Sequence, residues 1–71
     1  MSIKPGPYTH FKGKQYEVIA TATHSETLEE LVVYRPADGD GTLWVRPRNM
    51  WDELVLHNGK QIKRFTYRGE V

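Results

Sequence analysis

The sequence predicts a mostly β protein, a small SH3-like barrel of five to six short antiparallel strands. Two observations lead to this prediction. Apolar and polar residues alternate over short stretches, as they do in half-buried strands. Turn-forming residues separate these stretches at intervals of roughly 8–12 residues, which is typical of small sandwiches and barrels. A closed barrel also leaves no exposed sheet edge.

Length and composition limit the classes of protein that fit. The chain has 71 residues, so we expect a single domain over 1–71, with a lead-in at 1–7 and a frayed tail at 68–71. It contains no cysteine, which excludes disulfides and thiolate metal sites and fits a cytoplasmic protein. Its formal net charge is +1, and its longest apolar runs, such as 31–34, are far too short to cross a membrane.

The first half of the chain predicts two strands that are joined by a glycine turn. Tyr8–Phe11 is the first strand, and Lys12-Gly13 ends it. Gln15–Thr23 alternates with a period of two, which puts four residues on one face of the strand: Tyr16, Val18, Ala20 and Ala22. Ile19 is the exception on the otherwise polar opposite face.

The middle of the chain predicts a second pair of strands. Thr27 and Glu30 fit a helix capping box, but no helical apolar pattern follows, so we predict a turn before a strand over Glu30–Arg35. A loop over Pro36–Gly41 leads to a strand over Leu43–Pro47. Arg48–Trp51 is expected to form one short helical turn.

The last segment predicts a hairpin. Asn58-Gly59, a strong signal for a two-residue turn, separates strands over Asp52–His57 and Lys60–Tyr67. This turn pairs Val55 with Ile62, but other apolar residues, Phe65 among them, have the opposite phase. We therefore expect a β-bulge near Lys63.

The hairpin of Glu30–Arg35 and Thr42–Pro47 has a defined register. Pairing Val33 with Val45 is expected to bury four aliphatic side chains together: Leu31, Val33, Leu43 and Val45. The outer face then holds Tyr34 beside Trp44 and Val32 beside Arg46. Surfaces that combine aromatic rings and arginine are common in recognition sites. The alternative interpretation is that both rings belong to the core.

A series of short motifs resembles one bacterial family. In chain order they are Tyr8-Thr-His-Phe-Lys-Gly-Lys-Gln-Tyr-Glu-Val18, His24-Ser-Glu-Thr27, Glu30-Leu-Val-Val-Tyr-Arg35, Trp44-Val-Arg-Pro47, Met50-Trp51 and Arg64-Phe65. Their order and spacing, from Tyr8 to about Tyr67, resemble the family called domain of unknown function 1653. The resemblance implies a compact, mostly β domain and directs attention to the matched polar residues.

The sequence departs from this family at two positions. Leu28 follows Thr27 where the family usually has glycine, so a left-handed turn there costs roughly 1 kcal/mol. Trp51 stands where the family often has phenylalanine.

The leading functional hypothesis is a non-enzymatic module that binds a ligand or a protein partner, neither of which the sequence identifies. Tyr34 and Trp44 would stack, Arg35 and Arg46 would hold an anion, and His24 and Glu26 would supply hydrogen bonds. The structural alternatives stay open. Ser25 and Thr27 with His24 fit plain turn chemistry, and the two arginines fit braces to Glu17 or Glu30.

The sequence also allows two other functions. Single-stranded nucleic acid would bind the basic C-terminal hairpin through Lys60, Lys63, Arg64, Phe65 and Tyr67. A minimal hydrolase would centre on His24 and Glu26, although the chain has no nucleophile elbow. We expect neither a metal nor a cofactor, since the three histidines have no metal-site spacing and Asp38-Gly39-Asp40-Gly41 lacks the remaining ligands of a calcium loop.

Overall fold

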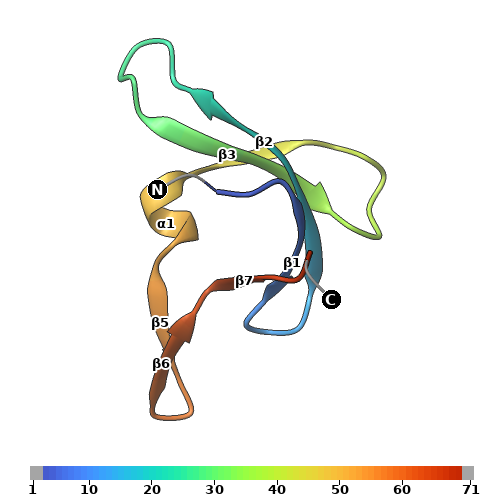
Figure 1. The fold of residues 1–71 in the computed structure, drawn as a ribbon, viewed down its shortest axis with the longest axis vertical. Helices are drawn as coiled ribbons and strands as arrows, with labels where there is room; N and C mark the ends of the chain where they lie inside the picture. Colours follow the sequence, from blue (N-terminus) through green and yellow to red (C-terminus); the bar gives the residue numbers. More distant parts are fainter. Residues whose placement is uncertain (1–2, 70–71) are drawn as a thin grey trace.

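The computed structural model describes residues 3–69, which contain seven strands and one short helix joined by turns and loops (Figure 1). They are, in order, β1 (Gly6–His10), β2 (Gln15–Thr23), β3 (Glu30–Pro36), β4 (Trp44–Pro47), α1 (Arg48–Trp51), β5 (Leu54–His57), β6 (Lys60–Lys63) and β7 (Phe65–Tyr67). A five-stranded antiparallel sheet has the order β4-β3-β2-β1-β7, and β5 and β6 form a separate hairpin. The mostly β prediction is confirmed, and no helix among these residues is long enough to cross a membrane.

Both ends of the described chain are tied into the sheet. Gly6 pairs with Val18, so β1 begins inside the stretch that the sequence suggested as a lead-in. Near the other end, the backbone N–H of Arg68 donates to the carbonyl of Pro7 at 2.8 Å. The outermost parts of the expected lead-in and frayed tail, residues 1–2 and 70–71, lie outside the described residues.

A β-bulge at Ile19 corrects the predicted faces of β2. Val18 pairs with Tyr34, but the next pair along the strand is Ala20 with Val33. The extra residue reverses the alternation, because side chains change face at every step along a strand. Ala20 therefore shares the outer face with Val33 and is exposed, whereas Val18 stays buried. The prediction that Ala20 and Ala22 share a face with Val18 is wrong.

The register predicted for β3 and β4 is confirmed, but the predicted burial is inverted. Val33 pairs with Val45, Val32 with Arg46, and Tyr34 with Trp44. Val32 is fully buried, while Val45 is 59% exposed. The face opposite to the predicted one is buried, because the face with Tyr34 meets the large rings of α1 and β7. Aromatic rings bury more area than aliphatic side chains. Leu31 and Val33 are half-buried, and Leu43 is exposed.

The C-terminal segment forms two strands instead of one bulged strand. Asn58 and Gly59 have φ values of 52° and 78°, as a primed two-residue turn requires, and Val55 pairs with Ile62 as predicted. The break comes at Arg64 and not through a bulge near Lys63. There the chain leaves the β5–β6 hairpin and joins β1 as β7, which accounts for the change of apolar phase.

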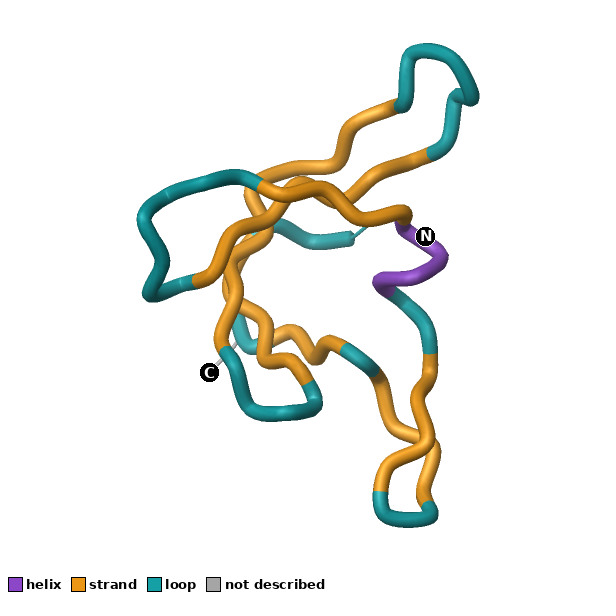
Figure 2. Tube along the Cα trace, turned by 180° about the vertical axis from the view of Figure 1, so that it is seen from behind, coloured by secondary structure: helices purple, strands orange, loops and turns teal. Residues whose placement is uncertain are grey.

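Five side chains form the buried core: Tyr8, Val18, Val32, Trp51 and Phe65. Trp51, at the end of the predicted helical turn, lies parallel to Phe65 with ring centroids 3.7 Å apart. Figure 2 shows α1 and β5 facing the curved sheet across its open side. Backbone pairing among residues 3–69 leaves the sheet open, so closure into an SH3-like barrel stays a prediction.

The two tryptophans provide a matched test of this core. Trp51→Ala is expected to lower the free energy of unfolding by about 3–5 kcal/mol, because it removes a ring that is 2% exposed. Trp44→Ala is expected to cost less than about 1 kcal/mol, because Trp44 is 56% exposed. Urea unfolding followed by circular dichroism measures both, and Trp51→Phe provides a milder variant. Equal losses for Trp44→Ala and Trp51→Ala would contradict this core.

The left-handed turn expected at Leu28 is present. Leu28 has φ of 64°, is 74% exposed, and its N–H donates to the carbonyl of His24 at 2.9 Å. Such a conformation costs a residue with a Cβ atom roughly 1–2 kcal/mol. The exposed side chain gains little packing in return, so this position holds local strain.

Leu28→Gly is therefore expected to stabilise the protein by about 0.5–1 kcal/mol. Glycine removes the left-handed strain, although part of the gain is offset by its greater freedom in the unfolded chain. The control is Asn58→Gly, at φ of 52°, where asparagine already tolerates the conformation and little change is expected. Thermal unfolding measures both variants, and a lower midpoint for Leu28→Gly would refute the strain.

Candidate functional site

The loop with His24 and Glu26 is hydrogen-bonded as a turn. The Nδ1 atom of His24 accepts hydrogen bonds from the backbone N–H groups of Glu26 at 3.1 Å and Thr27 at 3.3 Å. The hydroxyl of Thr27 accepts a hydrogen bond from the N–H of Glu29 at 3.2 Å. The side chains of His24 and Thr27 thus satisfy backbone amides, in agreement with the turn interpretation.

Tyr34 and Trp44 are cross-strand neighbours with different surroundings. The Tyr34 ring lies 5.1 Å from Trp51 and 5.6 Å from Tyr16, centroid to centroid, so it packs against the core. Trp44 is largely exposed on the edge strand β4. Of the two rings predicted to stack on a ligand, Trp44 is the one that solvent reaches freely.

The two arginines that were predicted to hold an anion, Arg35 and Arg46, also have different surroundings. Arg35 donates from Nε and Nη2 to one carboxylate oxygen of Glu17, at 3.0 and 2.7 Å. This is the structural brace that the sequence left open. Arg46 points instead toward the interior, where its guanidinium carbon lies 5.7 Å from the centroid of the Phe65 ring.

The six predicted binding residues do not form one cluster. Tyr34, Arg35 and Trp44 lie together at one end of the β3–β4 pair, and Arg46 follows further along β4. The loop with His24 and Glu26 projects from the opposite end of β2 and β3 (Figure 1). A single ligand the size of one ring cannot contact both ends.

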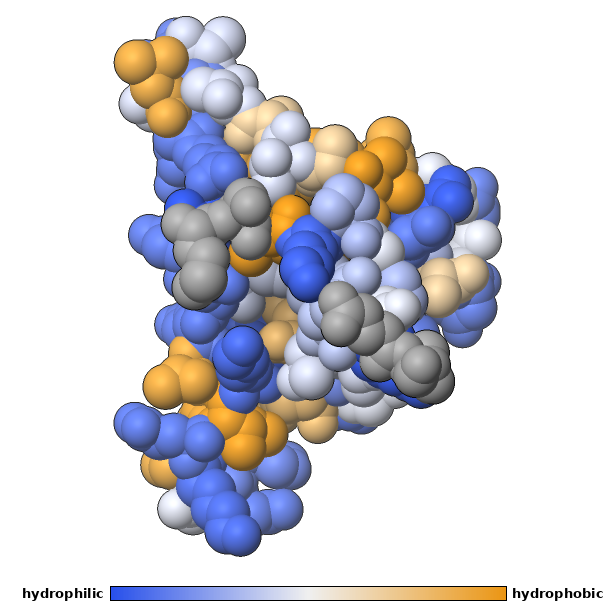
Figure 3. Space-filling model, in the orientation of Figure 1, coloured by the Kyte–Doolittle hydropathy of each residue, from blue (hydrophilic) through white to orange (hydrophobic). Residues whose placement is uncertain are grey.

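The residues of the nucleic-acid hypothesis are also divided between surface and interior. Lys60 and Lys63 are exposed on β6, and hydrophilic residues cover the tip of this hairpin (Figure 3). Arg64 is paired with Glu53 at 2.9 Å. Phe65 is only 5% exposed, so its ring is not open to a base, and Tyr67 is half-buried.

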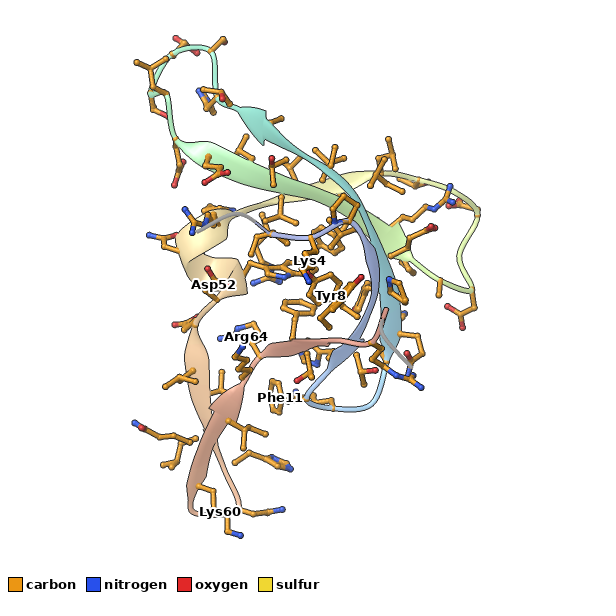
Figure 4. The ribbon with its side chains drawn as sticks, viewed as in Figure 1. Lys4, Tyr8, Phe11, Asp52, Lys60 and Arg64 are labelled. Carbon is orange, nitrogen blue, oxygen red and sulfur yellow. The ribbon has the colours of Figure 1, made fainter. Side chains whose placement is uncertain are left out.

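A pocket of about 230 Å³ lies between α1 and strands β1 and β7. Four of its lining residues are aromatic and three are charged. The full lining consists of Ile3, Lys4, Tyr8, Trp51, Asp52, Lys63, Phe65 and Tyr67. Figure 4 shows Lys4 and Tyr8 in the middle of the molecule, Asp52 beside α1, and Lys60 far away at the tip of the hairpin.

The rings of this pocket are held by contacts with one another. Tyr8 meets the edge of Trp51 at 5.4 Å and is tilted against Tyr67 at 5.2 Å, while Trp51 stacks on Phe65. The ammonium group of Lys4 lies over the Tyr67 ring, 5.4 Å from its centroid. These contacts fix the aromatic walls before any ligand is present.

Tyr8 acts in this pocket as a neutral hydrogen-bond donor. Its hydroxyl donates to the carbonyl of Lys4 at 2.8 Å. Burial raises the pKa of the phenol, and the nearby Tyr67 and Asp52 raise it further. Tyr8 therefore stays protonated at neutral pH and anchors the segment around Lys4.

Sequence reasoning missed most of this pocket. Lys63, Phe65 and Tyr67 appear in the nucleic-acid hypothesis, but Tyr8, Trp51 and Asp52 were not suggested as binding residues. No local signal links them, because they come from segments far apart in the sequence. The relevant hint was the number of aromatic residues, more than so small a core can fully bury.

No metal centre is formed within residues 3–69. This part of the chain has no group of three or more His, Cys, Asp or Glu residues that could hold a metal ion. The pocket itself brings one carboxylate, Asp52, together with two lysines. Its side chains suit binding through ring contacts and charge.

Comparison with known proteins identifies the family. The family model described as "Protein of unknown function (DUF1653)" matches residues 6–67. The fold is similar to the crystal structure of a DUF1653 protein from Bordetella bronchiseptica, with a TM-score of 0.83 and 35% sequence identity over 99% of this chain and 92% of that chain. No curated protein matches the chain. The resemblance seen in the sequence motifs is confirmed: the chain belongs to the DUF1653 family, whose function is unknown.

Proposed function

We propose that this chain is a small non-enzymatic binding module whose ligand enters the aromatic pocket. One observation carries the proposal: four aromatic residues and three charged residues line the same small pocket. Ligand sites are usually concave and mainly apolar, with a few polar groups that orient the ligand. In this proposal the pocket replaces the Tyr34–Trp44 pair as the polar and aromatic recognition surface.

The size and charge of the pocket indicate the class of ligand. Its volume of about 230 Å³ lies below the roughly 300–1,000 Å³ of sites for drug-sized molecules, so it suits a single ring with short substituents. Aromatic walls favour a planar ligand. Lys63 lines the pocket with a cationic side chain, so the expected ligand carries a negative group, such as a carboxylate.

A binding role fits the side chains better than catalysis does. The pocket lining contains no histidine, serine or cysteine. His24, the centre of the hydrolase hypothesis, has its Nδ1 atom engaged by backbone amides. We further propose that the module acts in the cytoplasm, where a chain without cysteine needs no oxidising environment.

The pocket is tested with benzoate and related single-ring carboxylates by NMR chemical-shift perturbation. Perturbed amides are expected around Tyr67, Asp52 and Lys63. Lys63→Gln is expected to weaken benzoate binding by about threefold, because it removes one of the two cations at the pocket.

The matched control is Lys60→Gln, on the same strand but at the hairpin tip and outside the pocket lining (Figure 4). It removes the same charge and is expected to leave benzoate affinity unchanged. Perturbations confined to other surfaces, or equal effects of Lys60→Gln and Lys63→Gln, would count against the pocket.

A second candidate function is binding of single-stranded nucleic acid. The observation that favours it is a contact between two loops: the rings of Phe11 and His57 lie 5.5 Å apart, so the β1–β2 turn meets the β5–β6 hairpin. The Lys12 ammonium lies over the Phe11 ring, 5.8 Å from its centroid, so this contact sets a lysine of the β1–β2 turn beside the hairpin that carries Lys60 and Lys63. Phe11 and His57 then offer the stacking rings that buried Phe65 cannot.

Lys60→Gln and Lys63→Gln also distinguish nucleic-acid binding from ligand binding in the aromatic pocket. If an oligonucleotide binds this hairpin, Lys60→Gln and Lys63→Gln are expected to weaken binding to similar extents, and affinity falls steeply as salt rises. Fluorescence anisotropy with a short labelled single strand measures both effects. Absence of binding at about 50 mM salt would remove this candidate.

A further inference from the structure

Arg46 has no carboxylate partner within residues 3–69. Its side chain reaches from the edge strand β4 across the interior to Phe65 on β7, the opposite edge of the sheet. Its Nε atom is buried and has no hydrogen-bond partner, and no ion pair to Arg46 occurs in the described part of the chain. A half-buried guanidinium in this state is costly unless a negative group approaches it.

Other basic residues are grouped around His10, whose ring lies against Phe65. Arg64 directly precedes Phe65, its carbonyl accepts a hydrogen bond from the N–H of Phe11 at 2.9 Å, and its own Nε atom is also buried without a partner. His10 lies 5.0 Å from Phe65, ring to ring. The backbone N–H of Lys12 donates to His10 Nδ1 at 3.1 Å, and the Lys12 ammonium lies over the Phe11 ring, 5.8 Å from its centroid. The carboxylate of Glu53, on Arg64, is the negative group in contact with these residues.

The electrostatics around His10 agree with this arrangement. Burial lowers the pKa of His10, and the positive charges of Arg64, Lys12 and Arg46 lower it further. All three charged neighbours that affect His10 thus have the same sign. His10, which lies against Phe65, therefore has several positive neighbours, although the chain as a whole has a formal charge of only +1.

We propose that Arg46 and Arg64, with His10 and Lys12, form a binding site for a small oxyanion beside Phe65. The guanidinium groups offer paired N–H donors, which match the oxygens of a phosphate group better than single donors do. The ligand is a phosphate, either as the free ion or as the charged end of a small phosphate monoester. None of the four residues lines the aromatic pocket, so this site is distinct from the one of the proposed function.

The site is tested by adding inorganic phosphate at constant ionic strength and following two sets of NMR signals. The Arg46 and Arg64 Nε–H resonances are expected to shift in a saturable manner. The His10 imidazole is expected to titrate at higher pH in saturating phosphate, because the anion offsets the charges that lower its pKa. A parallel titration with phenyl phosphate identifies the source: tighter binding than inorganic phosphate indicates a monoester, and equal binding indicates the free ion.

Two substitutions distinguish a specific phosphate site from general attraction of phosphate to a positively charged surface. Arg46→Gln is expected to weaken phosphate binding about tenfold, in line with the loss of one charge-assisted contact. Arg35→Gln removes the same charge from the neighbouring strand, where Arg35 is paired with Glu17, and is expected to change the affinity less than about twofold. Equal losses for the two variants would overturn the proposal.

A third variant, Arg46→Lys, tests whether the geometry of the donors matters as well as their charge. Arg46→Lys keeps the charge but not the paired donors, and it is expected to weaken phosphate binding severalfold. The signals of the unmodified chain decide the matter even if both Arg46 variants unfold. Unchanged Arg46 and His10 resonances throughout the phosphate titration would overturn the site, whereas failure of benzoate to bind would affect only the aromatic pocket.

Discussion

The stack of Trp51 on Phe65 is the contact on which the rest of this small structure depends. The two rings are parallel within 1° and 3.7 Å apart, and they join the short helix α1 to the edge strand β7. Backbone hydrogen bonds do not close the sheet among the described residues, so side chains must cover its concave face. Trp51 and Phe65 are two of the five buried side chains in the described part of the chain, so much of the core depends on this contact.

Both candidate sites depend on the side chains that cover the concave face of the sheet. The pocket forms where Tyr8 and Tyr67 continue the aromatic row beside Trp51 and Phe65. The cationic cluster forms because Arg46 on one edge strand reaches Phe65 on the other. A barrel closed by backbone pairing would place hydrogen-bonded strands at this seam and leave less space for either site.

Local sequence patterns predicted most strands and turns correctly, but they did not predict which face of each strand is buried. The Asn58-Gly59 turn, the short helix ending at Trp51 and the Val33–Val45 register depend on neighbouring residues and were predicted correctly. Alternation alone cannot say which face of a strand is buried when both faces contain apolar residues, as in Glu30–Pro36. The bulge at Ile19 then reversed the faces of half of β2, and no turn-forming residue marks its position.

The sequence by itself determined most of the strands and turns, how β3 pairs with β4, and the family of the chain, because each depends on short-range spacing. It also marked Leu28 as a position of left-handed strain. Only the tertiary structure decided that Val32 lies inside and Val45 outside, and that Arg46 turns toward Phe65. Those outcomes depend on α1 and β7 packing against a sheet formed by distant segments, and no local pattern encodes the position of a partner that far along the chain.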